Sequence, residues 1–423
     1  MYEISRLKNG VVVATAEMPH MASTSLGVWV GVGGRYEPSP SNGMCHFIEH
    51  MLFKGTQKRT AREISAAVEG IGGYLNAFTG EESTCFYSRA SHEQFARVLE
   101  VIMDMFLNSR FAPDDIEKER GVVKEEIAMY LDQPHQHVQE LLNETMWPGH
   151  PLGRPLTGTP KTLDDFTRKK VIEYQQSNYN ARTTVITAAG NVRHRELVKA
   201  VAHYARYFPE GKRPTFLPAD VAQDKPRIKL FTKATEQMQI AMGFRLCSRH
   251  DDRRFALRVL NAILGDNMSS RLFQSLREDH GLAYSVHSSV HFLEDTGVLT
   301  ISAGLDDDNL AKALELIRRE LRCCVSTLPT VKELRQARDY LIGQLDLTLE
   351  NTENHMMWLG DHLLGYGKVH SRADIAKRVG VVTAAQVRAV AREFLKPERL
   401  SVAMVSPLKD DRIVSRAVAA GFS

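Results

Sequence analysis

Four prolines and one glycine lie close together near the middle of this 423-residue chain, from Phe208 to Pro226. Proline fixes one backbone dihedral and lacks the N–H that a helix or strand uses, so this density is typical of a linker. The chain is also too long for one ordinary domain. We therefore predict a first domain over residues 1–212, a linker over residues 213–226 and a second domain over residues 227–423.

The two halves on either side of this linker repeat one order of predicted elements. The strand-like residues 26–30 parallel residues 240–244, and the helical residues 95–106 parallel residues 310–321. Alternating strands and helices around two cores predict an α+β fold for each half.

Residues 46–50 read His-Phe-Ile-Glu-His and lie in a segment with the apolar spacing of a helix. Apolar side chains recur there at i, i+3, i+4, i+7 and i+8, namely Met44, Phe47, Ile48, Met51 and Leu52. His46 and His50 share a different face, close enough together to bind one zinc ion. Glu49 lies beside them, and the order His-x-x-Glu-His is the inverzincin signature. The alternative is a pair of core histidines that only form hydrogen bonds.

A third metal ligand has to come from elsewhere, because a catalytic zinc site takes three protein ligands and a water. Residues 113–131 read as a helix that starts at a proline and has acidic residues in its first turn. Glu119 and Glu126 share one stripe of this helix, whereas Glu125 points about 100° away. A carboxylate on a partly buried stripe is costly unless a cation meets it, which favours Glu126 as the ligand. The alternative is that Glu119 and Glu126 belong to an ordinary charged face of this helix that is exposed to solvent.

The motif and its surroundings resemble the pitrilysin family of zinc peptidases, which includes insulin-degrading enzyme and mitochondrial processing peptidase. The resemblance rests on the spacing from His50 to Glu126, on a second glutamate seven residues earlier, and on neighbouring residues. Those neighbours are Gly-Met-Cys before the motif, Met-Leu-Phe-Lys-Gly-Thr after it, and Gly-Gly-Tyr-Leu-Asn-Ala-Phe-Thr at residues 72–79. The length of the chain matches short, two-domain members.

The resemblance implies a role for each of these polar residues. His46, His50 and Glu126 would bind one Zn²⁺ per chain, and Glu49 would be the general base. Glu119 would support the site by orienting a ligand.

The resemblance also implies a fold of two tandem homologous domains, each a mostly antiparallel sheet packed with helices. The second domain would hold no metal and would contribute substrate-binding residues. Arg277 and Tyr284 match an arginine and a tyrosine that contact substrate, and both can donate to a carbonyl oxygen on which charge develops. The alternatives are an Arg277 that only pairs with Glu278 or Asp279, and a Tyr284 that is part of the core.

Residues 74–79 resemble the edge strand that takes up substrate as an added strand in this family. Asn76 is the expected polar contact there. A protected edge without a ligand is the alternative.

The composition of the chain argues against nucleic-acid binding and against a membrane protein. Hydrophobic residues make up 43% and charged residues 25%, as in ordinary globular proteins. A net charge of +3 without a basic block gives no basis for nucleic-acid binding. The sequence shows neither a long apolar run nor a signal-peptide core, so we expect no membrane partner and a cytoplasmic location. The five cysteines, without a Cys-x-x-Cys pair, predict free thiols, and Cys45 is expected to be a packing residue.

We expect a zinc-dependent endopeptidase that cleaves unfolded peptides or presequence-like segments inside a chamber closed by two chains. Glu49 would activate the zinc-bound water. A homodimer is the expected assembly. One alternative is a catalytic subunit that works only in a heterodimer with a zinc-free homologue, and another is a non-catalytic structural relative.

Overall fold

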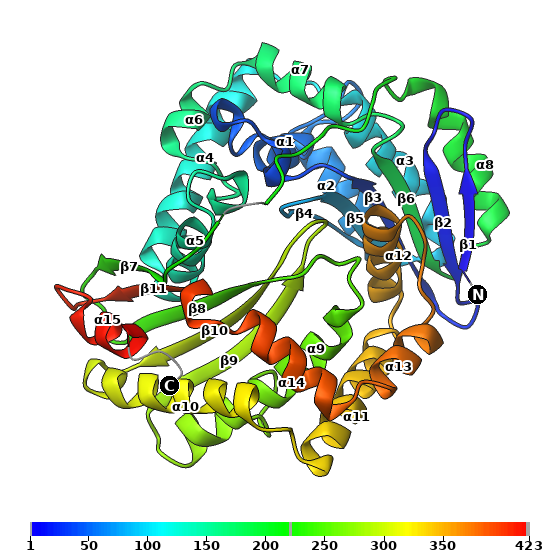
Figure 1. The fold of residues 1–423 in the computed structure, drawn as a ribbon. Helices are drawn as coiled ribbons and strands as arrows, with labels where there is room; N and C mark the ends of the chain where they lie inside the picture. Colours follow the sequence, from blue (N-terminus) through cyan, green and yellow to red (C-terminus); the bar gives the residue numbers. More distant parts are fainter. Residues whose placement is uncertain (1, 220–221, 420–423) are drawn as a thin grey trace. The chain divides into compact units, whose positions relative to one another are not determined.

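The computed structural model describes residues 2–219 and 222–419 and divides the chain into two compact units (Figure 1). The first unit comprises Met1–Ala128, Arg154–Leu217 and Leu347–His370, and the second comprises Met129–Gly153, Pro218–Asp346 and Ser371–Ser423. Each unit contains one β-sheet with helices packed on both faces. In the described part of the chain, no helix has the length and apolar character needed to cross a membrane.

Six strands form the sheet of the first unit, in the order β1-β2-β6-β3-β5-β4. Neighbouring strands β2 and β6 run parallel, and the other neighbours run antiparallel. The strands are β1 (Tyr2–Arg6), β2 (Val12–Glu17), β3 (Ser23–Val30), β4 (Tyr74–Thr79), β5 (Thr84–Ser91) and β6 (Thr184–Gly190). Every residue of β6 is buried, as expected for a central strand that is covered on both faces.

Strand β3 shows how the two faces of this sheet are covered. Successive side chains of a strand point to opposite faces, so Leu26 and Val28 join the core that contains Phe47, whereas Trp29 packs on the other side with Met356. The helices of this unit are α1 (Met44–Leu52), α2 (Ala61–Glu69), α3 (Phe95–Asn108), α4 (Pro113–Asp132), α6 (Pro160–Asp164), α7 (Arg168–Asn178), α8 (His194–Tyr204) and α12 (Thr352–Tyr366). Helix α4 continues into the range of the second unit.

The sheet of the second unit has the order β7-β11-β8-β10-β9 and repeats the arrangement of β2, β6, β3, β5 and β4. Its parallel pair is β7 and β11. The strands are β7 (Arg227–Thr232), β8 (Met238–Leu246), β9 (Ala283–Phe292), β10 (Gly297–Leu305) and β11 (Leu400–Ser406). Two α+β units with the same strand arrangement and mostly antiparallel sheets confirm the predicted fold class.

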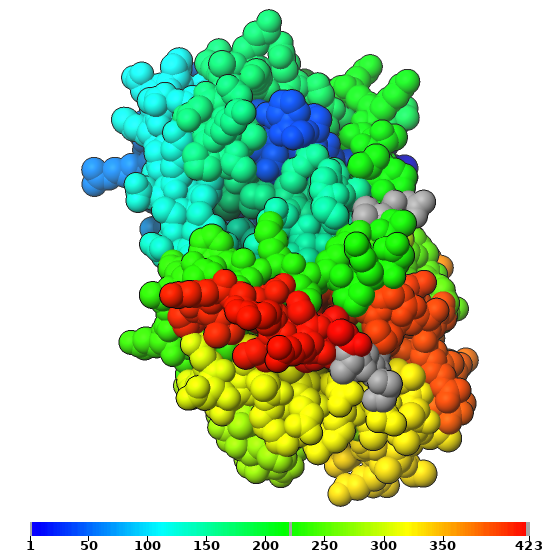
Figure 2. Space-filling view, turned by 60° about the vertical axis from the view of Figure 1, so that its left-hand side comes forward, coloured from blue at the N-terminus to red at the C-terminus, as the bar shows by residue number. Residues whose placement is uncertain are grey.

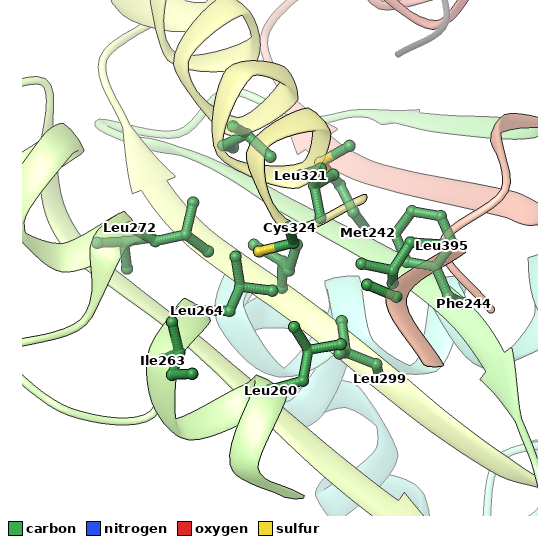
Figure 3. Packing of buried hydrophobic residues seen from close by; sticks show 14 of the residues in the cluster. Met242, Phe244, Leu260, Ile263, Leu264, Leu272, Leu299, Leu321, Cys324 and Leu395 are labelled. Atoms are coloured by element: carbon green, nitrogen blue, oxygen red, sulfur yellow. The ribbon is translucent and has the colours of Figure 1, made fainter. Parts of the chain in front are cut away.

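The core of the second unit lies between this sheet and its helices. Figure 3 shows Phe244 of β8 and Leu299 of β10 in the same buried cluster as Leu260 of α9 and Leu321 of α10. Helix α15 lies beside α10 on the surface of this unit (Figure 2). The helices and the π-helical segment of the unit are α5 (Pro134–Met146), α9 (Arg253–Leu264), η6 (Phe273–Glu278), α10 (Leu310–Ser326), α11 (Val331–Thr348), α13 (Arg372–Gly380), α14 (Ala384–Phe394) and α15 (Arg412–Ala419).

Each unit takes one covering helix from the opposite half of the sequence. Helix α5 packs on β8 and β11, and helix α12 packs on β3 and β6 (Figure 1). A Cβ atom at Gly243 of β8 would lie 2.4 Å from the Met146 sulfur, and one at Gly27 of β3 would lie 2.4 Å from the Met356 sulfur. These two glycines therefore let the helices approach the sheets closely.

The compact units consequently differ from the contiguous ranges 1–212 and 227–423 predicted from the sequence. Residues 129–153 pack in the second unit, and residues 347–370 pack in the first. The physical reason is that both faces of each central strand are apolar, so each sheet needs a second covering helix. The predicted linker, residues 213–226, contains no helix or strand among its described residues.

Candidate metal centre

Helix α1 carries the His-x-x-Glu-His run and presents it away from the core. Its apolar stripe is buried in the first unit, namely Met44, Phe47, Ile48, Met51 and Leu52. His46, Glu49 and His50 lie on the other face, where all three remain partly exposed. The helix begins after Gly43, whose φ of 92° is left-handed and therefore favours glycine.

The structure brings the three predicted metal ligands together. Single donor atoms of His46, His50 and Glu126 all lie within 4.8 Å of one another. His46 Nε2 lies 3.7 Å from one carboxylate oxygen of Glu126, and His50 Nε2 lies 3.4 Å from the other. Glu125, the neighbouring carboxylate on α4, is not part of this cluster.

The donor set fits a zinc ion. Burial, with a smaller contribution from the nearby His50, lowers the pKa of His46 to about 4, so this imidazole is neutral as a metal ligand must be. Two histidines and one carboxylate also leave a position for water on a four-coordinate zinc.

His50 carries a proton that a metal ion would displace. Burial alone would lower the pKa of His50, but hydrogen bonds with Glu119 and Glu126 outweigh it and raise the pKa to about 9. Its Nδ1 lies 2.8 Å from Glu119 Oε1, and this contact leaves Nε2 facing Glu126. A carboxylate behind a ligating histidine orients the ring and increases its basicity.

Glu119 is held by two cationic groups. One of its carboxylate oxygens contacts His50, and the other lies 2.7 Å from Nζ of Lys54. Burial would raise the pKa of Glu119, but the hydrogen bonds from His50 and Lys54 outweigh burial and lower it. The sequence reasoning missed Lys54, and helical periodicity offers no signal for this contact, because Lys54 lies two residues beyond the last residue of α1.

Glu49 lies on α1 beside the ligands but outside the three-residue cluster. Its Oε2 accepts a hydrogen bond of 2.5 Å from Oγ1 of Thr79, the last residue of β4. Burial raises the pKa of Glu49, and the Thr79 hydroxyl partly opposes this rise. A carboxyl group tuned towards neutral pH suits proton transfer.

A second carboxylate, Glu37, caps the start of α1. Its two oxygens accept hydrogen bonds of 2.7 Å from the backbone N–H groups of Gly43 and Cys45. Gly43 has no side chain to cap the helix, and a Cβ there would meet Gly158 at 2.6 Å. Burial raises the pKa of Glu37 to about 7 against the effect of these donors. The sequence reasoning did not single out Glu37, because it lies outside the helix that it caps.

Strand β4 lies at the edge of the first sheet and pairs with β5 alone among the described strands. Tyr74, Asn76 and Phe78 on its outward face are exposed. Asn76 uses its side-chain oxygen to accept the N–H of Ala77, at 2.8 Å, and its contact with substrate remains a prediction.

Arg277 and Tyr284 lie in the second unit. Tyr284 is 75% exposed at the start of edge strand β9, which excludes the alternative that it is a core residue. The Arg277 guanidinium lies 5.8 Å from the centre of the Tyr284 ring and 5.1 Å from that of Phe273. The contact of both residues with substrate remains a prediction.

The cysteines are free thiols, as predicted. Cys45, next to His46 in sequence, is buried, and its sulfur lies 3.3 Å from the Tyr174 hydroxyl.

Two family models and several curated relatives match this chain. Residues 12–160 match the family described as insulinase (peptidase family M16), and residues 165–341 match the peptidase M16 inactive domain. An uncharacterized zinc protease of Bacillus subtilis, YmxG, is 37% identical over 95% of this chain and 97% of its own length. Another, from Mycobacterium leprae, is 35% identical over 97% of this chain and 93% of its own length.

Solved structures share the fold. A protease from Helicobacter pylori has a TM-score of 0.89 at 21% identity, covering 96% of this chain and 99% of its own. A chain of complex III2 from Candida albicans has a TM-score of 0.85 at 18% identity, covering 99% of each chain. A protease and a component of complex III2 therefore share this architecture, so the side chains of the site, rather than the fold, have to indicate the function.

Proposed function

The chain belongs to peptidase family M16, and from this premise we propose that it is a zinc-dependent endopeptidase that cleaves unfolded peptides or presequence-like segments. The proposal rests mainly on the cluster of His46, His50 and Glu126. Glu49 lies beside this cluster but is not one of its three donor residues. One zinc ion per chain is proposed.

The three clustered side chains would hold the metal, which when bound supplies a Lewis acid that polarises a peptide carbonyl and makes water more acidic. Glu119 keeps the His50 ring oriented through Nδ1. Glu49 accepts a proton from water as the water oxygen bonds to the carbonyl carbon. The same carboxyl group then passes the proton to the leaving amine as the C–N bond breaks.

We propose that the peptide binds in an extended form along the free edge of β4, where main-chain hydrogen bonds add it to the sheet. Asn76 would make a polar contact with it. Arg277 and Tyr284 would donate hydrogen bonds to the carbonyl oxygen. Two copies of the chain would associate as a homodimer.

Two alternative functions would give different results for zinc binding and peptide hydrolysis. A catalytic subunit that needs a zinc-free homologue would bind zinc but show no hydrolysis as a purified single chain. A non-catalytic structural relative would show neither, and the retained cluster of three ligands argues against it.

Substitution of Glu49 by Gln tests the proposal. The change is nearly isosteric and leaves the three ligands in place, so the variant should keep its zinc while hydrolysis of a quenched peptide falls by about 10²–10⁴. Glu125→Gln, at the neighbour of Glu126 outside the cluster, is the control. Loss of zinc in Glu49→Gln would make Glu49 a ligand, and unchanged hydrolysis would refute its role as the base.

A further inference from the structure

We propose that Thr79 is a positioning residue whose hydroxyl fixes the carboxylate of Glu49 and ties it to edge strand β4. This inference rests on the proposed function, because it concerns the group that accepts the proton. The observation behind it is the hydrogen bond of 2.5 Å from Thr79 Oγ1 to Glu49 Oε2.

The strand brings the Thr79 side chain to the inner face of the sheet. Burial alternates along β4: Tyr74, Asn76 and Phe78 are exposed, whereas the residues between them are half-buried. Leu75 and Ala77 pack against the core that contains α1. Thr79 continues this inner row and therefore faces α1 rather than solvent.

The contact selects one arrangement of a flexible side chain. Glu49 has three rotatable bonds, and among the described residues Thr79 is its one hydrogen-bond donor. The hydroxyl occupies Oε2 and leaves Oε1 for exchange of a proton with water. A general base is effective only within hydrogen-bonding reach of the proton that it accepts, so a carboxylate held in one orientation spends more of its time in a productive geometry.

The same contact connects the base with the proposed binding edge. Thr79 ends β4 and pairs with Thr84 of β5, so its backbone belongs to the strand at the edge of the sheet. A peptide added along that edge would order β4 up to its last residue. Binding of an extended peptide would then favour the orientation of Glu49 that catalysis requires.

Two substitutions separate the hydroxyl from the shape of the side chain. Thr79→Val keeps the β-branched shape that suits a strand but removes the donor. Thr79→Ser keeps the donor and removes a methyl group. If Thr79 only fills space, Val should be the milder change, and if the hydroxyl positions Glu49, Ser should be the milder change.

We expect Thr79→Val to keep its zinc and its KM while kcat falls about 10–100-fold, and Thr79→Ser to stay within about threefold of the wild type. In a Glu49→Gln background, Thr79→Val should cause no further loss, because the two residues act as one unit. Crystal structures of the zinc-free variants show the orientation of the Glu49 side chain without relying on activity. Glu49 should contact residue 79 in the wild type and Thr79→Ser, and should leave that position in Thr79→Val.

The outcomes separate this inference from the proposed function. Hydrolysis that survives Glu49→Gln, or a wild type that cleaves no peptide, overturns both. An inactive Glu49→Gln combined with a fully active Thr79→Val overturns the role of Thr79 alone. The role also fails if Thr79→Ser loses as much kcat as Thr79→Val, or if Glu49 keeps its orientation in crystals of Thr79→Val.

Discussion

Replacing Glu37 by Gln should change how the stability of the first unit depends on pH. Glu37 is almost fully buried, and its carboxylate oxygens accept the N–H groups of Gly43 and Cys45 at the start of α1. Burial raises its pKa from 4.5 to about 7. The group therefore binds a proton more tightly in the folded chain than in the unfolded chain.

The sign and size of the effect follow from this difference. A carboxyl group with a raised pKa contributes stability below about pH 4.5 and loses that contribution as pH rises through about 7. Each tenfold change in proton affinity corresponds to about 1.4 kcal/mol. Between pH 5 and pH 8, ionisation of Glu37 should therefore lower the free energy of unfolding by about 2–3 kcal/mol.

The glutamine side chain in Glu37→Gln does not titrate, so the variant lacks this pH-dependent contribution. Its amide nitrogen cannot accept one of the two backbone N–H groups, which costs about 1–3 kcal/mol at every pH. The wild type should accordingly be the more stable protein at pH 5. Its advantage over Glu37→Gln should shrink by about 2–3 kcal/mol by pH 8.

Urea unfolding of metal-free protein, followed by tryptophan fluorescence, measures this difference. The chain has three tryptophans, and Trp29 and Trp358 lie in the first unit, whereas Trp147 lies in the second. A Trp147→Phe background therefore makes the signal specific to the first unit, which matters because two units need not unfold in one step. Chelation removes the stabilisation that bound zinc would add.

The comparison between wild type and variant isolates Glu37, because every other titrating group is common to both. Glu93→Gln, which removes a carboxylate from the same unit, controls for the loss of one negative charge. A stability difference between wild type and Glu37→Gln that stays constant from pH 5 to pH 8 would refute the reasoning. It would mean that the backbone donors keep the carboxylate ionised throughout this range.

The remaining predictions concern the site. Glu126→Ala should lose tight zinc binding and hydrolysis together, whereas Glu125→Ala should keep both; metal analysis showing the reverse pattern would refute the choice of ligand. Glu119→Gln should weaken zinc affinity, measured by competition with a chelator, or turnover of a quenched peptide by about 10–100-fold. If both are unchanged, Glu119 does not support the metal site. Arg277→Ala and Tyr284→Phe should keep full zinc content while turnover falls by about 10²–10³, and wild-type kinetics in both would make the second unit a scaffold.

The residues of the candidate site could be identified from the sequence because helical periodicity is local. The spacing of His46 and His50 on one helix, and of Glu119 and Glu126 on another, specifies which side chains share a face without reference to the rest of the fold. The structure adds that the two faces meet. The repeat of strands and helices in the two halves likewise indicated two α+β units, because each repeat carries the apolar pattern of its own core.

The tertiary structure decided what depends on contacts between distant segments. Nothing in the local pattern of α5 or α12 shows which sheet it will cover, because an apolar helix face fits any apolar sheet face of suitable shape. Close approach at Gly243 and Gly27 selects the partner, and it becomes visible only once strands and helices are packed. The hydrogen bonds from Thr79 to Glu49 and from the start of α1 to Glu37 join residues on different elements. Sequence periodicity places side chains on faces, but packing alone determines which faces meet and which buried polar groups satisfy each other.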